Sequence, residues 1–266
     1  MSAEVSPSLV TTVKWGVSDT LAMTWRNLIK YFRIPQLLIF SSIQPVMFVL
    51  LFNYVFGGAI KLPPNLHLAN YTDFLMPGIF VQTAIFGSTQ TGIGLAEDLS
   101  KGMIDRFRSL PMARSAVLTG RTLSDTIRNA FVILLMTGVG LVIGFRIHNG
   151  LLNAFYAFVL ILGFSFAFTW VSAFIGLIVR DVETAQVAGF IWIFPLTFAS
   201  SVFVPVAGMP TWLQEFATRN PITLTANAAR SLILGGDVSP LPAGLWIVGI
   251  LVVFVPLAVM RYRRAT

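Results

Sequence analysis

Long apolar stretches alternate with short polar ones along the chain, and this pattern predicts membrane-spanning helices. Six apolar runs cover residues 37–56, 74–96, 127–145, 151–179, 185–206 and 245–260. A helix needs about 20 apolar residues to cross the hydrocarbon core of a bilayer. The strands of a membrane barrel would instead be about ten residues long, with alternating polarity. The pattern therefore predicts an all-α polytopic membrane protein with six transmembrane helices.

The composition supports this class. Hydrophobic residues make up 56% of the 266 residues and charged residues only 11%, whereas soluble domains carry about 25% charged residues. We expect a single domain over residues 1–266, with a cytoplasmic or interfacial segment at 1–35, a six-span bundle at 36–260 and a cytoplasmic tail at 261–266. The chain has no cysteine, and its two histidines lie far apart, so we expect neither a disulfide framework nor a metal centre.

The distribution of positive charge predicts the orientation of the chain. If both termini lie on one side, that side holds fourteen of the 18 lysine and arginine residues, and four lie on the other side: Lys61, Arg146, Arg219 and Arg230. Cytoplasmic connections of membrane proteins carry an excess of Lys and Arg. Both termini are therefore predicted to be cytoplasmic. The same bias explains the net charge of +7 without nucleic acid as a partner.

The stretch EDLSKGMIDRFRSLPMAR, residues 97–114, is a charged segment between two apolar runs. As a helix, it would carry an apolar stripe at Leu99, Met103 and Phe107 and would end at Pro111. The rest of its surface would be charged, with Glu97, Asp98, Lys101, Asp105, Arg106 and Arg108. One interpretation is a loop made basic by topology alone. The stripe and the proline favour the other, a short cytoplasmic helix that docks on a partner protein.

Two further segments outside the spans have mixed character. Residues 13–32 combine aromatic and basic residues, which is typical of an amphipathic helix in the membrane interface; a disordered tail with a short anchor is the alternative. Residues 208–236, before the last span, are half apolar, and Pro210 and Pro221 suit helix starts. This segment is either a pair of short outward-facing helices or a plain extracellular loop.

Amide side chains within the first two predicted spans are candidates for a substrate path: Gln44, Asn53, Gln82 and Gln90. Packing between helices is the commoner explanation, because small residues such as Thr83, Gly87 and Gly94 recur along one stripe of the second span. No predicted span carries an acidic or basic residue near its middle. This argues against a proton relay or a voltage sensor.

Sequence signatures of enzymes are missing. No G-x-x-x-x-G-K-S/T motif is present to cradle phosphates, so the chain is not expected to hydrolyse ATP itself. No pair of carboxylates is placed for acid–base catalysis. A catalytic set is thus not expected, and we predict a chain that is not an enzyme.

Three blocks of the sequence resemble a known family: KGMIDRFRSLPMARSAVLTGRTLSDTIRNAF, VFVPVAGMPTWLQEF and RNPITLTANAARSLILGG. Together they look like the permeases of the ABC type-2 exporter superfamily, especially its daunorubicin-resistance-like branch. The resemblance extends over nearly the whole chain.

The resemblance implies a bacterial plasma-membrane permease that forms a homodimer, or a heterodimer with a related permease. It would pair with separate nucleotide-binding ATPase subunits, which bind ATP and Mg, so no cofactor is expected in this chain. Residues 97–110 would be the coupling helix, and the substrate path would lie at the dimer interface around the first, second and fifth spans. The implied cargo is a hydrophobic or amphipathic drug, lipid or glycan-lipid. The alternatives are an ATP-independent secondary transporter or channel and, less suited to these residues, a membrane-embedded enzyme.

Overall fold

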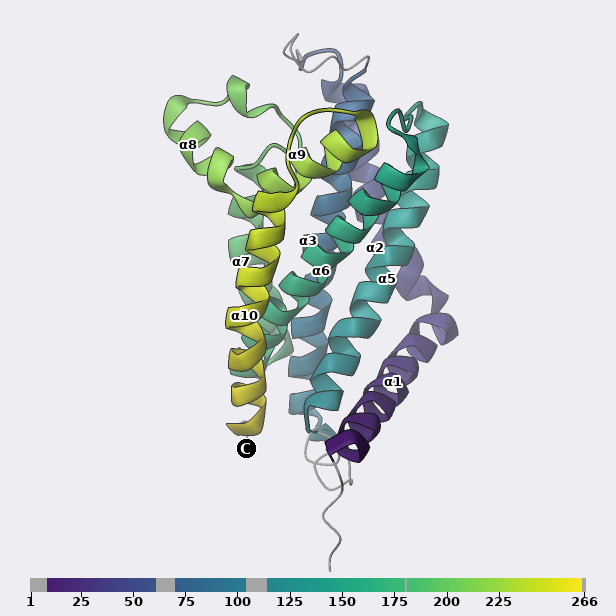
Figure 1. Ribbon diagram of the computed structural model, residues 1–266, viewed down its shortest axis with the longest axis vertical. Coiled ribbons are helices and arrows are strands. Elements are labelled where there is room, and N and C mark those ends of the chain that lie inside the picture. Colours follow the sequence, from purple (N-terminus) through teal and green to yellow (C-terminus); the bar gives the residue numbers. More distant parts are fainter. Residues whose placement is uncertain (1–8, 61–69, 104–113, 180, 265–266) are drawn as a thin grey trace, which may run out of the picture.

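The computed structural model describes residues 9–60, 70–103, 114–179 and 181–264, which form helices and no strand (Figure 1). The predicted all-α class is confirmed for these residues. The elements are α1 (Leu9–Arg33), α2 (Pro35–Leu50), the π-helix η1 (Leu51–Phe56), α3 (Tyr71–Ser100), α5 (Arg114–Ile143), α6 (Gly150–Val179), α7 (Val182–Phe198), the 3-10 helix η3 (Val206–Gly208), α8 (Thr211–Arg219), α9 (Pro221–Leu234) and α10 (Leu241–Arg264).

Four helical segments are long and apolar enough to cross a bilayer: Leu38–Phe56, Ser115–Ile143, Gly150–Val179 and Leu241–Arg264. They correspond to the first, third, fourth and sixth predicted spans. The second and fifth predicted spans are the helices α3 and α7. α3 carries more polar residues, and α7 has only 17 residues, near the lower limit for a span. The chain is a multi-pass membrane protein, and six crossings stay a prediction.

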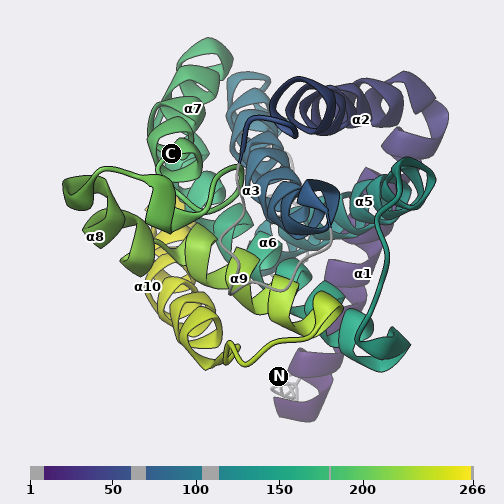
Figure 2. The ribbon, with the colours of Figure 1, turned by 90° about the horizontal axis from the view of Figure 1, so that it is seen from above.

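The helix α3 lies at the centre of the bundle. It packs against α5, α6, α7 and α9, and these helices surround it in Figure 2. Most of its residues from Tyr71 to Ala96 are buried. A helix enclosed by other helices can carry hydroxyls and amides, because its neighbours or its own backbone can bind them. For example, the Thr83 hydroxyl donates to the Ile79 carbonyl at 2.7 Å.

Two predicted boundaries were wrong. The third span was expected to begin at residue 127, but α5 begins at Arg114, because the polar turns before residue 127 are covered by α1 and α3 and remain helical. The fifth span was expected to reach residue 206, but α7 ends at Phe198. Pro195 lies in its last turn, where a proline weakens the helix by removing a backbone donor.

The N-terminal segment is the helix α1, which runs alongside α5 (Figure 1). A disordered tail is therefore wrong for residues 9–33. Pro35 then begins α2 at its first turn, as expected of proline at a helix start. α1 leaves large apolar side chains exposed, with Trp15, Trp25 and Phe32 each more than 60% accessible. Its position in the membrane interface stays a prediction.

The connection before α10 contains the two predicted short helices, α8 and α9, so a plain loop is wrong. Asn220 joins α9 to the end of α7. Its Oδ1 accepts the backbone N–H of Ile222 at 2.9 Å, and its Nδ2 donates to the carbonyls of Leu196 and Ala199 at 2.7 and 3.0 Å. α9 is largely buried in the bundle, which is where short helices at membrane depth are tolerated.

A close approach of the α3 and α6 backbones at Gly92 and Gly176 predicts that one added methyl group lowers stability. A Cβ atom on Gly176 would collide with the backbone carbonyl of Gly92, so Gly176→Ala is expected to cost about 1–3 kcal/mol of stability. The melting temperature of the purified chain in detergent measures this. Gly138→Ala is the control, because a Cβ atom there meets nothing within 4 Å. Equal melting temperatures for the two variants would contradict the prediction.

Candidate functional site

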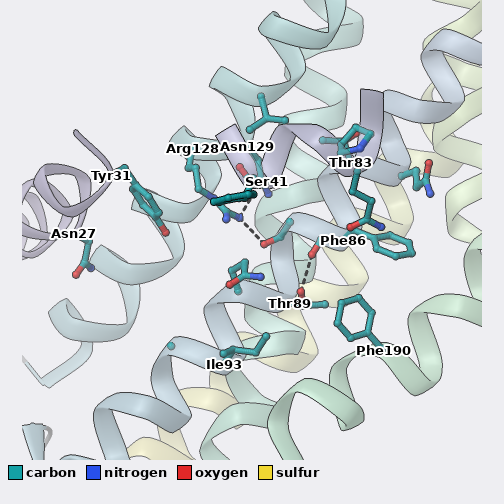
Figure 3. A pocket seen from close by; sticks show the side chains of 18 of the residues that line it. Asn27, Tyr31, Ser41, Thr83, Phe86, Thr89, Ile93, Arg128, Asn129 and Phe190 are labelled. Atoms are coloured by element: carbon teal, nitrogen blue, oxygen red, sulfur yellow. Dashed lines mark hydrogen bonds between the residues drawn. The ribbon is translucent and has the colours of Figure 1, made fainter. Parts of the chain in front are cut away.

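A cavity of about 430 Å³ lies between α1, α2, α3, α5 and α7 (Figure 3). Binding sites for small molecules typically enclose roughly 300–1,000 Å³. Aromatic side chains from three helices line part of it: Phe40 and Phe48 of α2, Phe86 of α3 and Phe190 of α7. Polar side chains from α1, α2, α3 and α5 line the rest. The cavity therefore offers both apolar and polar contacts to one ligand.

Three of the four substrate-path candidates line this cavity. Gln82 is buried, with 3% of its surface accessible, while Gln44 and Gln90 are exposed. Asn53 does not line it. Its side chain lies on η1 and accepts a hydrogen bond from the Thr72 hydroxyl at 2.6 Å. The three glutamines thus share one cavity, and their contact with substrate stays a prediction.

One buried carboxylate next to the cavity holds three helices together. Asp125 of α5 is fully buried and accepts hydrogen bonds from the hydroxyls of Tyr31 on α1, at 2.6 Å, and Thr91 on α3, at 2.7 Å. The Nε atom of Arg121 lies 3.4 Å from the same carboxylate. Arg121 also lies 3.5 Å from Asp98 near the end of α3. Asp125 and Arg121 therefore link α1, α3 and α5.

Two further polar residues of α5 continue this face toward α3 and α6. Arg128 donates from Nη2 to the carbonyl of Gly87 at 2.7 Å and to Oδ1 of Asn129 at 3.0 Å (Figure 3). Asn129 in turn donates to the Ser165 hydroxyl at 2.8 Å. The guanidinium of Arg128 also lies 5.6 Å from the ring centroid of Tyr31. Arg128 therefore contacts the Gly87 carbonyl, the Asn129 side chain and the Tyr31 ring.

The small residues of α3 make room for these side chains. A Cβ atom on Gly87 would collide with Asn129, and one on Gly94 would collide with Arg121. The packing interpretation of the small-residue stripe is therefore confirmed at these two positions. The partners are polar side chains of α5, so the stripe serves both helix packing and the polar cluster.

These contacts overturn the expectation that no span carries charge near its middle. Arg121, Asp125 and Arg128 all lie in α5, and Arg128 is near the midpoint of the apolar segment Ser115–Ile143. The charge distribution predicts that Arg121 and Arg128 lie on the cytoplasmic side. The sequence did hold a signal: Arg121, Asp125, Arg128 and Asn129 have the spacing i, i+4, i+7, i+8, which places them on one face of a helix.

The predicted coupling segment is only partly described. α3 ends at Ser100, and Gly102 follows with a φ angle of +64°, a conformation that favours glycine. A continuous helix from Glu97 to Leu110 is therefore wrong, because the helix is interrupted by a turn between Leu99 and Met103. Asp105, Arg106, Phe107 and Arg108 lie outside the described residues.

The described residues of this segment contact the bundle to different degrees. Leu99 is half-buried and packs against the cluster around Leu118 and Trp170, so it does not present a free surface to a partner. Lys101 is exposed and pairs with Glu97 at 2.5 Å, and this hydrogen bond raises the pKa of Lys101. The role of these residues toward an ATPase subunit stays a prediction.

Comparisons with known proteins place the sequence in a family of transporters. Residues 18–234 match the family model described as ABC-2 type transporter. The chain is 33% identical over 257 residues to the daunorubicin resistance ABC transporter permease protein DrrB1 of Streptomyces coeruleorubidus, covering 94% of this chain and 87% of that protein. It is 32% identical over 259 residues to the probable doxorubicin resistance ABC transporter permease protein DrrC of Mycobacterium tuberculosis, covering 94% and 90%.

A more distant relative is the putative transport permease ycf38 of Cyanophora paradoxa, 28% identical over 221 residues, with 81% of this chain and 74% of that protein covered. The family match covers most of the chain, and the first two relatives cover nearly all of it. The chain therefore belongs to the ABC-2 type transporter family, as a permease.

Proposed function

We propose that the chain is the transmembrane subunit of an exporter that moves a hydrophobic or amphipathic substrate outward. The energy comes from ATP hydrolysed by a separate nucleotide-binding subunit, which holds ATP and Mg. Membership of a family of transporter permeases along most of the chain carries this proposal. Relatives that are drug-resistance permeases support it.

The cavity supports an amphipathic substrate, a drug, lipid or glycan-lipid. Its aromatic side chains favour an apolar body, while Gln44, Gln82 and Gln90 offer hydrogen bonds. The exposed position of Gln44 and Gln90 means that ligand, lipid or a second permease could cover them. We propose a homodimer, or a heterodimer with a related permease, in the bacterial plasma membrane.

Both termini are proposed to be cytoplasmic. Because Arg121 and Arg128 lie within α5, they no longer count toward the positive charge of the cytoplasmic side. The cytoplasmic side still holds twelve Lys and Arg residues, and the outer side holds four. The excess thus continues to support this orientation. α8 and α9 lie at the opposite end of the bundle from the C-terminus (Figure 1), so they would face outward.

Coupling to the ATPase subunit is proposed to involve the segment that follows α3. Leu99 packs inward, so the docking surface would rest on Met103 and Phe107. Met103→Glu and Phe107→Glu are each expected to reduce ATP-driven export about tenfold or more, because a charge in an apolar interface costs several kcal/mol. Export and ATPase activity are measured in proteoliposomes that contain both subunits.

Phe216→Glu is the control for this experiment. Phe216 is a 48% exposed residue of α8, at the other end of the bundle, so a new charge there tests insertion without touching the segment after α3. Normal export by both the Met103 and the Phe107 variants would contradict the docking surface.

An ATP-independent carrier is the second candidate function. The buried charges of α5 favour it, because ionisable groups within a membrane segment often belong to ion or proton pathways. Reconstitution of the permease with and without a co-purified nucleotide-binding subunit separates the two functions. Transport that needs the subunit and ATP supports the exporter, and transport driven by a proton gradient alone supports the carrier.

A further inference from the structure

We infer that the cavity binds the anionic headgroup of an amphipathic molecule, a phosphate or carboxylate joined to an apolar body. The inference rests on the proposed substrate path and adds to it the charge of the ligand. It comes from three unsatisfied polar atoms, from a buried cation that makes no direct ion pair and from the arrangement of apolar side chains beside them.

Three buried polar atoms of the cavity lining have no hydrogen-bond partner among the described residues: Nδ2 of Asn27, Oε1 of Gln82 and Nε of Arg128. Their residues are 9%, 3% and 6% accessible. An unsatisfied buried donor or acceptor is costly and rare in native structures. That three of them line one cavity indicates a ligand that supplies the missing partners. Two of the three are donors, as an oxyanion requires.

The charge of the lining points the same way. Arg128 makes no ion pair with a carboxylate in the part of the chain that the structure describes, although it is buried in a membrane segment. Asp125, one turn earlier, already accepts from Tyr31, Thr91 and Arg121. A buried cation without a direct ion pair is expensive within a bilayer. An anion beside Arg128 would remove this cost.

A second cation and an acceptor refine the ligand. Lys30 of α1 lines the cavity together with Arg128, so an oxyanion could be attracted by both. Oε1 of Gln82 needs a donor, which a hydroxyl on the headgroup would provide. Glu97 also lines the cavity, but it pairs with Lys101 at 2.5 Å. The polar lining therefore favours an anion over a cation.

The apolar lining accommodates the rest of the molecule. Phe40, Phe48, Phe86 and Phe190 contribute to the same cavity, and α2 exposes further apolar side chains such as Ile43 and Met47. A free inorganic anion would leave the aromatic side chains uncovered. A ligand with an anionic head and an apolar tail would cover both parts of the cavity.

The test compares two probes with the same tail and opposite heads. Binding of dodecyl phosphate and of dodecyltrimethylammonium to the purified full-length permease is measured by titration calorimetry. Dodecyl phosphate is expected to bind about tenfold more tightly, and Arg128→Gln is expected to remove this preference, since hydrogen bonds to charged groups are among the stronger ones. Arg146→Gln, an exposed arginine remote from the cavity, should bind as the native chain does.

A second variant keeps the test decisive if Arg128→Gln does not fold. Asn27→Asp replaces an unsatisfied donor by a carboxylate on α1, outside the segments that cross the membrane, and Arg26 lies beside it. It should weaken the binding of dodecyl phosphate by charge repulsion, and its melting temperature shows whether the variant is folded. Equal binding of the two probes to the native chain would overturn the inference. So would unchanged binding of dodecyl phosphate to a folded variant.

Competition identifies the source of the ligand. If phosphatidylglycerol displaces dodecyl phosphate and phosphatidylcholine does not, the natural ligand is a bilayer lipid. If neither lipid displaces it, the natural ligand is an anionic cargo. Either result supports an anionic site. Displacement by inorganic phosphate as effective as that by the lipid would overturn the need for an apolar body. These experiments measure binding and neither ATPase activity nor transport. A failure to bind the anion would therefore count against this site and not against the proposed exporter function.

Discussion

Asp125→Asn is expected to destabilise the bundle by about 3–5 kcal/mol, the cost typical of removing one partner of a buried ion pair. The carboxylate is fully buried and accepts from Tyr31, Thr91 and Arg121. An amide keeps the shape but removes the negative charge that compensates Arg121 and, one turn further on, Arg128. Because Tyr31 belongs to α1, the same change should loosen α1 from α5.

Two matched variants separate charge from hydrogen bonding at this position. Tyr31→Phe removes one hydroxyl and is expected to cost about 1 kcal/mol, while Arg121→Gln combined with Asp125→Asn removes both charges and should recover part of the lost stability. Melting temperatures and protease accessibility of α1 in the purified chain are the measurements. If Asp125→Asn were as stable as Tyr31→Phe, the carboxylate would not be the residue that holds α1, α3 and α5 together.

Helices with a clear apolar run could be predicted from the sequence. The fourth apolar run, 151–179, matches α6 (Gly150–Val179), because every turn of this segment is hydrophobic. The residues on either side of the run end the helix. The short helices α8 and α9 followed from Pro210 and Pro221, which have local physical reasons to precede or begin a helix. In these cases the information lies within the segment itself.

The polar face of α5 could not be assigned in the same way. Charged residues normally lie outside a membrane, so the sequence predicts a position on the cytoplasmic side for Arg121 and Arg128. α5 tolerates them because the ring of Tyr31 on α1 lies against Arg128, and Asp125 of α5 pairs with Arg121. Gly87 and Gly94 of α3 also leave space for the polar side chains of α5. That depends on which helices pack together. Spacing alone indicates a polar face but does not identify its partner.

The cavity illustrates the same limit. Gln44, Gln82 and Gln90 were chosen as polar residues in apolar runs, and they meet because α2 and α3 flank one space. Asn53 was chosen on equal grounds but lies elsewhere, bonded to Thr72. Asn27, Lys30 and Arg128 were not chosen, since nothing in the sequence brings α1 and α5 together. The break at Gly102 had a local signal, a glycine within the expected helix.

Arg230→Met is expected to cost about 3–5 kcal/mol of stability, because it removes several buried hydrogen bonds made by one charged group. Arg230 of α9 is 7% accessible, and it donates to backbone carbonyls of Phe74, Ser201 and Val202 at 2.7, 2.6 and 3.1 Å. Its guanidinium also stacks over the Phe74 ring, 3.8 Å from the centroid. One side chain therefore joins α9, α3 and the segment after α7.

Arg230→Lys tests whether charge or shape provides this stability. An ammonium keeps the charge but cannot reach several carbonyls at once or stack in a plane on Phe74, so we expect most of the loss to remain. Arg219→Met is the control, because Arg219 is exposed and its pair with Glu215 is at the surface; its effect should stay within about 0.5 kcal/mol. Melting temperature reports the loss, and hydrogen exchange of α8 and α9 locates it. A lysine variant as stable as the native chain would mean that a point charge suffices, and that the planar contacts to three carbonyls do not hold α9 in the bundle.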